Sequence, residues 1–275
     1  MIRVALLQMT SGIDPGANAA VLTNAIEEAA RGGAAMLFTP EMSGLIDRDR
    51  ARAAAHVVPE AESPVLRAVR EAAAERRIWV ALGSLAVARD EGRWANRSFV
   101  IDAKGEIAAR YDKIHMFDVE LDSGEAWRES AAYAPGEAVV TAETPAGRLG
   151  LAVCYDIRFP ALFEALGREH CDMIAIPAAF TVPTGEAHWH LLQRARAVEA
   201  SAYVVAAAQV GEHEDGRRTF GHSLVVDPWG EILLDMGGDE AGLGFAEIDP
   251  HRITEIRQQL PSLANRRAIL TSTGR

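Results

Sequence analysis

The sequence has 275 residues, of which 49% are hydrophobic, and its 28 basic and 39 acidic side chains give a formal net charge of −11. A chain of this length and apolar content can bury a sizeable core, which excludes an intrinsically disordered protein. The acidic balance argues against nucleic acid and anionic membranes as partners, because both attract basic surfaces.

Strand-like apolar runs alternate with helical patterns along the chain. The alternation alone predicts a parallel doubly wound sheet, whereas turn signals at 102–106 and 227–230 predict antiparallel hairpins and therefore mixed sheets. We expect one α/β domain over 1–275, whose segment 260–275 is an arm that packs on another subunit. In chain order, the predicted elements are strand 4–9, helix 18–31, strand 36–39, helix 63–76, strands 78–87, 98–101 and 150–153, helix 161–166, strand 173–176, helix 186–200, and strands 203–210, 223–226, 232–234 and 242–248.

We expect neither a signal peptide nor a membrane-spanning segment in this sequence. The first residues run directly into an apolar strand, without the basic lead and cleavage site of a signal peptide. No uninterrupted apolar run reaches about 18 residues, the length that indicates a membrane span. We therefore expect a cytoplasmic protein.

Lysine is rare in this sequence, since only Lys104 and Lys113 among the 28 basic residues are lysines. Because arginine has replaced lysine almost everywhere, a retained lysine indicates a need for a compact point charge. Lys104 lies in a predicted turn. Lys113 lies between apolar residues in the segment YDKIHMFD, where its ammonium group could stabilise an oxyanion.

The two cysteines are too few for a four-thiolate zinc site or a disulfide framework. Cys154 ends a buried strand and precedes a proline-started helix in RLGLAVCYDIRFP, a position typical of nucleophiles. Cys171 has no polar cluster beside it, so we expect an inert thiol in the core. A Cys–His pair stays open, because none of the eight histidines can be paired with Cys154 from the sequence alone.

Two segments carry glutamates that could take part in the same chemistry. Glu41 directly follows a buried strand in TPEMSG, where desolvation would raise its pKa and suit it to be a general base. Glu129 lies in WRESAAYAPG, and Glu125 lies one helical turn earlier. Either could be a second carboxylate that positions Lys113 or the base, and a solvated loop acid is the alternative for each.

Taken in order, PEMSG, YDKIHMFD and CYDIRFP resemble the nitrilase superfamily of carbon–nitrogen hydrolases, over nearly the whole chain from VALLQMT to GLGFAEID. The resemblance implies a four-layer α-β-β-α sandwich with two mixed sheets. It also implies that Glu41 is the general base, Lys113 the oxyanion donor and Cys154 the nucleophile. Glu129 is a looser match to the second glutamate of that site, and the backbone N–H of Tyr155 would help to hold the oxyanion.

Longer segments, among them KIHMFDVE and GHSLVVDPWG, look most like the Nit branch of amidases. This implies hydrolysis of a small carboxylated amide through a cysteine thioester, with deaminated glutathione as the first candidate and homodimers or larger assemblies. ω-Amides of α-keto acids, N-carbamoyl amino acids, acyl transfer to an amine and an inactive interaction module stay open as alternatives. We expect no metal and no organic cofactor.

A carboxylated substrate needs local positive charge on this acidic protein. Arg158, four residues after Cys154, is one candidate for binding the carboxylate, with a structural ion pair as the alternative. Phe180, Thr181 and His188 are further candidates for the pocket, although His188 could equally cap a helix or pack in the core.

Overall fold

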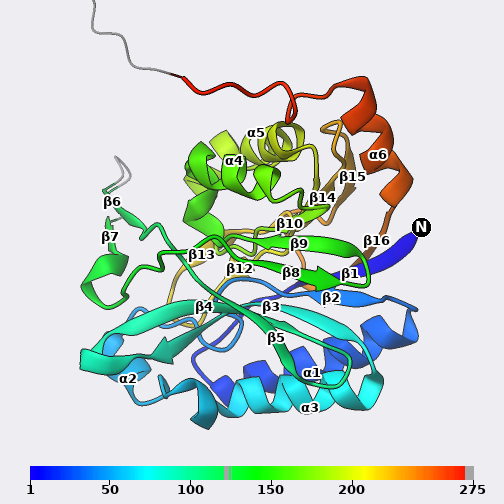
Figure 1. Cartoon of the computed structure of the whole chain (residues 1–275). Coiled ribbons are helices and arrows are strands. Elements are labelled where there is room, and N and C mark those ends of the chain that lie inside the picture. Colours follow the sequence, from blue (N-terminus) through cyan, green and yellow to red (C-terminus); the bar gives the residue numbers. More distant parts are fainter. Residues whose placement is uncertain (121–123, 125, 270–275) are drawn as a thin grey trace, which may run out of the picture.

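Two six-stranded sheets stack face to face in the described part of the chain, with helices on the outer side of each (Figure 1). The computed structural model describes residues 1–120, 124 and 126–269. Helices α1 (Pro15–Arg31) and α3 (Pro64–Arg76) cover the first sheet, and α4 (Pro160–Arg168) and α5 (Val182–Ala200) cover the second. This is the four-layer α-β-β-α sandwich that the resemblance implies.

The first sheet is mixed, as the predicted hairpins required. Its inner strands β1, β2 and β3 run parallel, whereas β3, β4 and β5 form antiparallel pairs. Gly105 has a φ of 77° in the turn between β4 and β5, a conformation that glycine adopts without strain. In spatial order the sheet consists of β16 (Gly242–Ile248), β1 (Ile2–Gln8), β2 (Met36–Phe38), β3 (Trp79–Ala88), β4 (Trp94–Ile101) and β5 (Ile107–Asp112).

The second sheet is also mixed, with an antiparallel hairpin between β14 and β15 at one edge. In spatial order it consists of β15 (Ile232–Asp235), β14 (Leu224–Val226), β11 (Tyr203–Ala206), β10 (Met173–Ala175), β9 (Gly147–Leu151) and β8 (Thr141–Thr144). Outside the two large sheets lie the hairpins β6 (Asp118–Glu120) with β7 (Ala126–Arg128) and β12 (Val210–Glu212) with β13 (Arg218–Phe220), and the helices α2 (Arg50–Ala54) and α6 (Pro250–Gln259).

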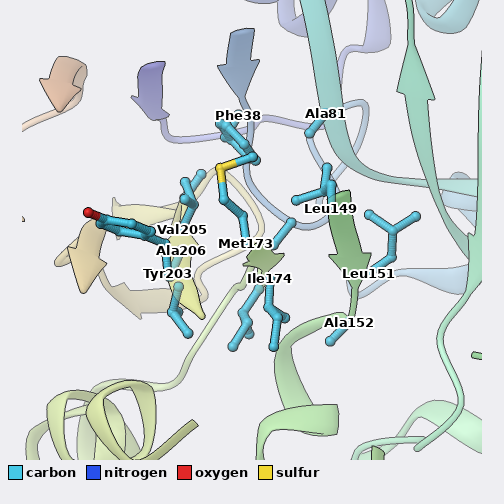
Figure 2. Close-up of a cluster of buried hydrophobic side chains, with 14 of the residues drawn as sticks. Phe38, Ala81, Leu149, Leu151, Ala152, Met173, Ile174, Tyr203, Val205 and Ala206 are labelled. Carbon is cyan, nitrogen blue, oxygen red and sulfur yellow. The ribbon is translucent and has the colours of Figure 1, made fainter. Parts of the chain in front are cut away.

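The main core fills the space between the sheets. In β2, Met36 and Phe38 face this core, whereas Leu37 points to the layer beneath α1 and α3, because successive side chains of a strand alternate between its faces. Figure 2 shows Phe38 of the first sheet against Met173 of the second, with Leu149 beside them. Because both faces of each sheet are covered, the inner strands such as β2 are apolar along their whole length.

The structure corrects several predicted elements. The single strand expected at 203–210 is wrong, because β11 ends at Ala206 and the chain then leaves the sheet to form β12. Helix α1 begins at Pro15, three residues earlier than expected, because Asp14 accepts a hydrogen bond from the N–H of Gly16. The side chain of Ser63 caps α3, as predicted.

The C-terminal part holds an element that we did not predict. Helix α6 begins at Pro250 behind the capping side chain of Asp249. Beyond it, the guanidinium group of Arg266 donates hydrogen bonds to the carbonyls of Glu164 and Glu199, so the described part of the expected arm contacts α4 and α5 of its own chain. No helix within the described ranges is both long and apolar enough to cross a bilayer.

Candidate active site

The backbone after β2 brings Glu41 to the edge of the core. Glycine at position 83 is required here, because a Cβ atom at that position would lie 2.0 Å from the carbonyl oxygen of Thr39. The carbonyl of Glu41 accepts a hydrogen bond from Gln209, and its carboxylate accepts one from the N–H of Ala179 at 2.9 Å. Segments that follow β10 and β11 of the second sheet therefore hold both the backbone and the side chain of Glu41 in place.

The ammonium group of Lys113 lies between two carboxylates. Its Nζ is 2.9 Å from Glu41 Oε1 and 2.9 Å from Glu129 Oε2, and its side chain is only 2% exposed. The N–H of Phe117 donates to Glu129 Oε2 at 2.7 Å, which fixes the second carboxylate. The structure thus brings together three of the residues singled out from the sequence, whereas the alternative Glu125 lies outside the described residues.

Asn96 is a member of this cluster that sequence reasoning missed. Its Nδ2 donates to Glu41 Oε1 at 2.9 Å and to Glu129 Oε1 at 3.0 Å. The backbone carbonyl of Asn96 accepts a hydrogen bond from the backbone N–H of Lys113. The side chain is buried on β4, next to the strand β5 that leads into Lys113. A single amide in an apolar strand gives no signal in the sequence, because its partners lie dozens of residues away.

Cys154 opens a 3-10 helix over Cys154–Arg158 that follows the second sheet. Its φ of 47° is in the left-handed region, and its N–H donates to the carbonyl of Pro177. Its side chain lines the same cavity as Glu41 and Lys113, and the charges of both residues act on the pKa of the thiol. The predicted strand-to-helix position is therefore correct, and it places the sulfur beside Glu41 rather than beside a histidine.

The buried side chain of Asp156 ties this turn to the segment that carries Lys113. Its carboxylate accepts from the Tyr111 hydroxyl at 2.7 Å, from the N–H of His115 at 3.0 Å and from the N–H of Val153 at 2.9 Å. Because Tyr111 belongs to β5, His115 follows β5 and Val153 follows β9, Asp156 links the turn of Cys154 to the segment that carries Lys113. Sequence reasoning missed this role.

The ionisation of the cluster corrects one prediction. We expected desolvation to raise the pKa of Glu41; burial does act in that direction, but the charge of Lys113 and hydrogen bonds from Lys113, Cys154 and Asn96 outweigh it and lower the pKa. Burial and the Glu41 charge raise the pKa of the Cys154 thiol well above its usual value. Although burial opposes it, the two glutamates also raise the pKa of Lys113. The resting state is thus a neutral thiol beside a carboxylate and an ammonium.

A cavity of about 710 Å³ opens onto this cluster, a volume within the range of small-molecule sites. Its wall includes Tyr155, Phe180 and Thr181 from the predicted set. Arg158 and His188 are not among its lining residues; they contact each other, with Arg158 Nη1 3.3 Å from His188 Nδ1. The wall also carries charged and aromatic side chains that the sequence did not point to, namely Arg48, Arg50, Trp94, Trp127, Arg128, Tyr133 and Arg217.

Away from this cavity, the described residues contain one group with the donors and spacing to hold a metal ion. Donor atoms of His190, His222 and Asp235 all lie within 4.8 Å of one another. The three side chains hydrogen-bond among themselves: His190 Nε2 is 2.8 Å from Asp235 Oδ2, and His222 Nδ1 is 2.9 Å from Oδ1. No metal-ligand spacing is visible in the sequence here, because α5, the loop after β13 and the end of β15 supply one residue each.

Known proteins share both the sequence and the fold. Over 97% of this chain and 93% of its own length, the deaminated glutathione amidase of Yersinia enterocolitica is 41% identical. Saccharomyces cerevisiae Nit3, a member of branch 10 of the nitrilase superfamily, superposes with a TM-score of 0.84 at 30% identity over 94% of both chains. A glutamine-for-glutamate mutant of an amidase from Nesterenkonia sp. AN1, with acrylamide added to its active-site cysteine, gives 0.79 at 27% identity over 95% of this chain and 98% of that one.

The model of one enzyme family covers almost the entire chain. The carbon-nitrogen hydrolase model matches residues 3–258, which include both sheets and every member of the Glu41, Lys113, Glu129 and Cys154 cluster. The chain belongs to the carbon-nitrogen hydrolase family.

Proposed function

We propose that this protein is a thiol amidohydrolase that cleaves the amide bond of deaminated glutathione through a thioester on Cys154. One observation carries the proposal: Cys154, Glu41 and Lys113 lie together on the wall of a cavity large enough for a small amide, with Lys113 Nζ 2.9 Å from Glu41 Oε1. The names of the curated relatives, which are 41% and 37% identical in Yersinia enterocolitica and in human, supply the substrate.

The first half of the proposed reaction acylates the cysteine. Glu41 accepts the thiol proton while Sγ attacks the amide carbonyl carbon, and the carbonyl oxygen becomes an oxyanion held by Lys113 Nζ and the N–H of Tyr155. One such donor contributes about 3–4 kcal/mol to transition-state stabilisation. The tetrahedral intermediate collapses when the C–N bond breaks, and the leaving amine takes its proton from Glu41.

The second half releases the acid. Glu41, ionised again, removes a proton from water, the resulting hydroxide attacks the thioester carbonyl, and Cys154 leaves and recovers its proton. Glu129 accepts hydrogen bonds from Lys113 in each step and holds the ammonium toward the oxyanion. Moving a proton from Cys154 to Glu41 does not change the net charge of the cluster, so the buried site gains no uncompensated charge in either half-reaction.

A substrate panel tests this proposal. Purified enzyme is given deaminated glutathione, 2-oxoglutaramate and an N-carbamoyl amino acid, and the released amine or ammonia is measured together with the mass of the acyl-enzyme. We expect the highest kcat/KM for deaminated glutathione, with cysteinylglycine as the leaving amine and a 2-oxoglutaryl adduct on Cys154. A higher kcat/KM for 2-oxoglutaramate or for the carbamoyl compound would assign the enzyme to ω-amides or to carbamoyl hydrolysis instead.

We further propose that the protein is a cytoplasmic homodimer, in which the helix layer that contains α5 packs against the same layer of a second copy. Exposed apolar side chains gather on α5 and on the β14–β15 hairpin, where Leu191 is 67% exposed and Trp229 is 49% exposed. Both buried cysteines are free thiols, which suits a reducing compartment. Light scattering coupled to gel filtration should give twice the chain mass for the wild type and a monomer for Leu191→Glu; a monomeric wild type would contradict the assembly.

A further inference from the structure

Two guanidinium groups converge on one indole ring in the wall of the active-site cavity. The Cζ atom of Arg217 lies 4.5 Å from the ring centroid of Trp127, and that of Arg48 lies 5.6 Å from it. All three side chains line the cavity that also contains Cys154. Both distances are in the range of a cation–π interaction, which holds the two guanidinium groups on the cavity wall.

Arg217 is charged, largely buried and incompletely paired. Its side chain is 18% exposed, and burial lowers its pKa. The nearest carboxylate oxygen, Asp215 Oδ2, lies 3.5 Å from Nη2, which is long for a hydrogen bond. Its Nε has no hydrogen-bond partner among the described residues. Leaving a buried charged donor without a partner is costly, and an anionic ligand would remove that cost.

Other carboxylates on this wall are engaged elsewhere. Asp47 accepts two hydrogen bonds from Arg52, at 2.6 and 2.8 Å, and Glu41 and Glu129 are held by Lys113. The one carboxylate in an ion pair with Arg217 among the described residues is that of Asp215, whose side chain is buried, and its 3.5 Å contact leaves the Nε of Arg217 without a hydrogen-bond partner. By contrast, Arg158, the arginine that the sequence pointed to, does not line the cavity, and its Nη1 lies 3.3 Å from Nδ1 of His188.

We propose that Arg217, assisted by Arg48, binds the carboxylate at the far end of the substrate's acyl group and thereby selects carboxylated amides over neutral ones. This inference rests on the proposed amidase function. The acyl group stays on the enzyme through both half-reactions while the amine leaves after the first, so an anchor on the acyl side positions the carbonyl for attack by Cys154 and then by water. A guanidinium group binds a carboxylate through two parallel hydrogen bonds, which gives orientation as well as affinity.

Glutaramate and pentanamide test the anchor, because they differ only in a carboxylate against a methyl group at the end opposite the amide. For Arg217→Gln we expect kcat/KM for glutaramate to fall on the order of 100-fold, while that for pentanamide stays within about 3-fold. Arg48→Gln should show the same selectivity change at about 10-fold. Arg218→Gln is the matched control, since this neighbouring arginine is exposed and does not line the cavity.

A binding measurement keeps the test independent of turnover. Glutarate should bind the Cys154→Ala protein, and adding Arg217→Gln should raise its Kd by a similar factor, with unchanged melting temperature for both proteins. Equal losses on glutaramate and pentanamide, or no loss on either, would overturn the anchor while leaving the amidase function intact. Failure of the wild type to cleave any amide, deaminated glutathione included, would instead overturn the proposed function and this inference with it.

Discussion

Both cysteines are buried, but they differ in the side chains around them. Cys154 is 7% exposed and Cys171 is fully buried, and burial raises the pKa of both thiols, that of Cys171 to about 12. Cys154 shares its cavity wall with Glu41 and Lys113, whose charges both act on the pKa of the thiol. Cys171 packs in the core between the sheet and α4. A buried thiol therefore becomes a candidate nucleophile through its neighbours and not through its own acidity.

This difference explains how a cysteine with a raised pKa can still react. A low resting thiolate fraction is no obstacle when a carboxylate accepts the proton during the attack itself. Glu41 is in position to do so, whereas the carboxylates that influence Cys171 act only through their charge. The proposed catalytic role of Cys154 thus depends on geometry, and replacing each cysteine by alanine in turn tests it directly.

The largest effect is expected for Cys154→Ala. Loss of the nucleophile should lower kcat by about 10⁴-fold or more, with a melting curve like that of the wild type. The matched variant Cys171→Ala should keep its kcat and lose about 1 kcal/mol of unfolding free energy, because it leaves a small gap in the core. Ammonia release and thermal melting measure both. An active Cys154→Ala enzyme, or an inactive but folded Cys171→Ala enzyme, would remove the distinction between the two thiols.

The next effect concerns the two lysines, which differ in the same way. Lys113 is buried between Glu41 and Glu129, whereas Lys104 is exposed in the turn between β4 and β5. In Lys113→Arg the charge is kept, but the wider guanidinium group does not fit between the carboxylates, and we expect kcat to fall about 100- to 1,000-fold. Lys104→Arg should leave kcat unchanged. A Lys113→Arg enzyme within a few-fold of the wild type would show that charge alone is required.

Much of the fold was predictable because its signals are local. A capping serine followed by proline marked the start of α3, and runs of apolar residues marked the inner strands. The strand expected at 203–210 failed for a non-local reason. Gln209 turns away from the sheet to hydrogen-bond Ser11 and the carbonyl of Glu41, and apolar periodicity contains no information about those partners.

The residues proposed to react could be named from the sequence because each lies in a short, ordered motif that resembles a known family. The residues that support or surround them were not. Asn96 and Asp156 work through contacts with residues dozens of positions away, and Arg217 lies in a loop whose sequence resembles any solvated turn. Only the folded arrangement of the two sheets brings Asn96 and Arg217 to the cavity wall and Asp156 into contact with Tyr111.

Asn96 offers a smaller effect that sharpens the account of Glu41. Its Nδ2 bonds to both glutamates, so Asn96→Ala removes two charge-assisted hydrogen bonds without touching the thiol. We expect kcat to fall about 10- to 100-fold with KM little changed. Ser98→Ala, on the same strand, is a control for packing, because its hydroxyl bonds to the carbonyl of Gly83 rather than to the cluster. Equal losses in both variants would indicate a general disturbance of β4 instead of a positioning role.

The smallest effect is a shift on the pH axis. Glu41 must be ionised to accept the thiol proton, and its pKa is lowered below the usual 4.5, so the acid limb of kcat/KM should lie below pH 4.5. The same lowering stabilises the fold above the unfolded-state pKa, and that contribution is lost as the pH falls through the folded-state value. Asn96→Ala removes one of the hydrogen bonds that lower the pKa and should move the acid limb upward, whereas Cys171→Ala should leave it in place. Profiles of kcat/KM against pH, recorded with circular dichroism to follow unfolding, give the result; an acid limb unmoved by Asn96→Ala would show that Asn96 does not contribute to the lowered pKa of Glu41.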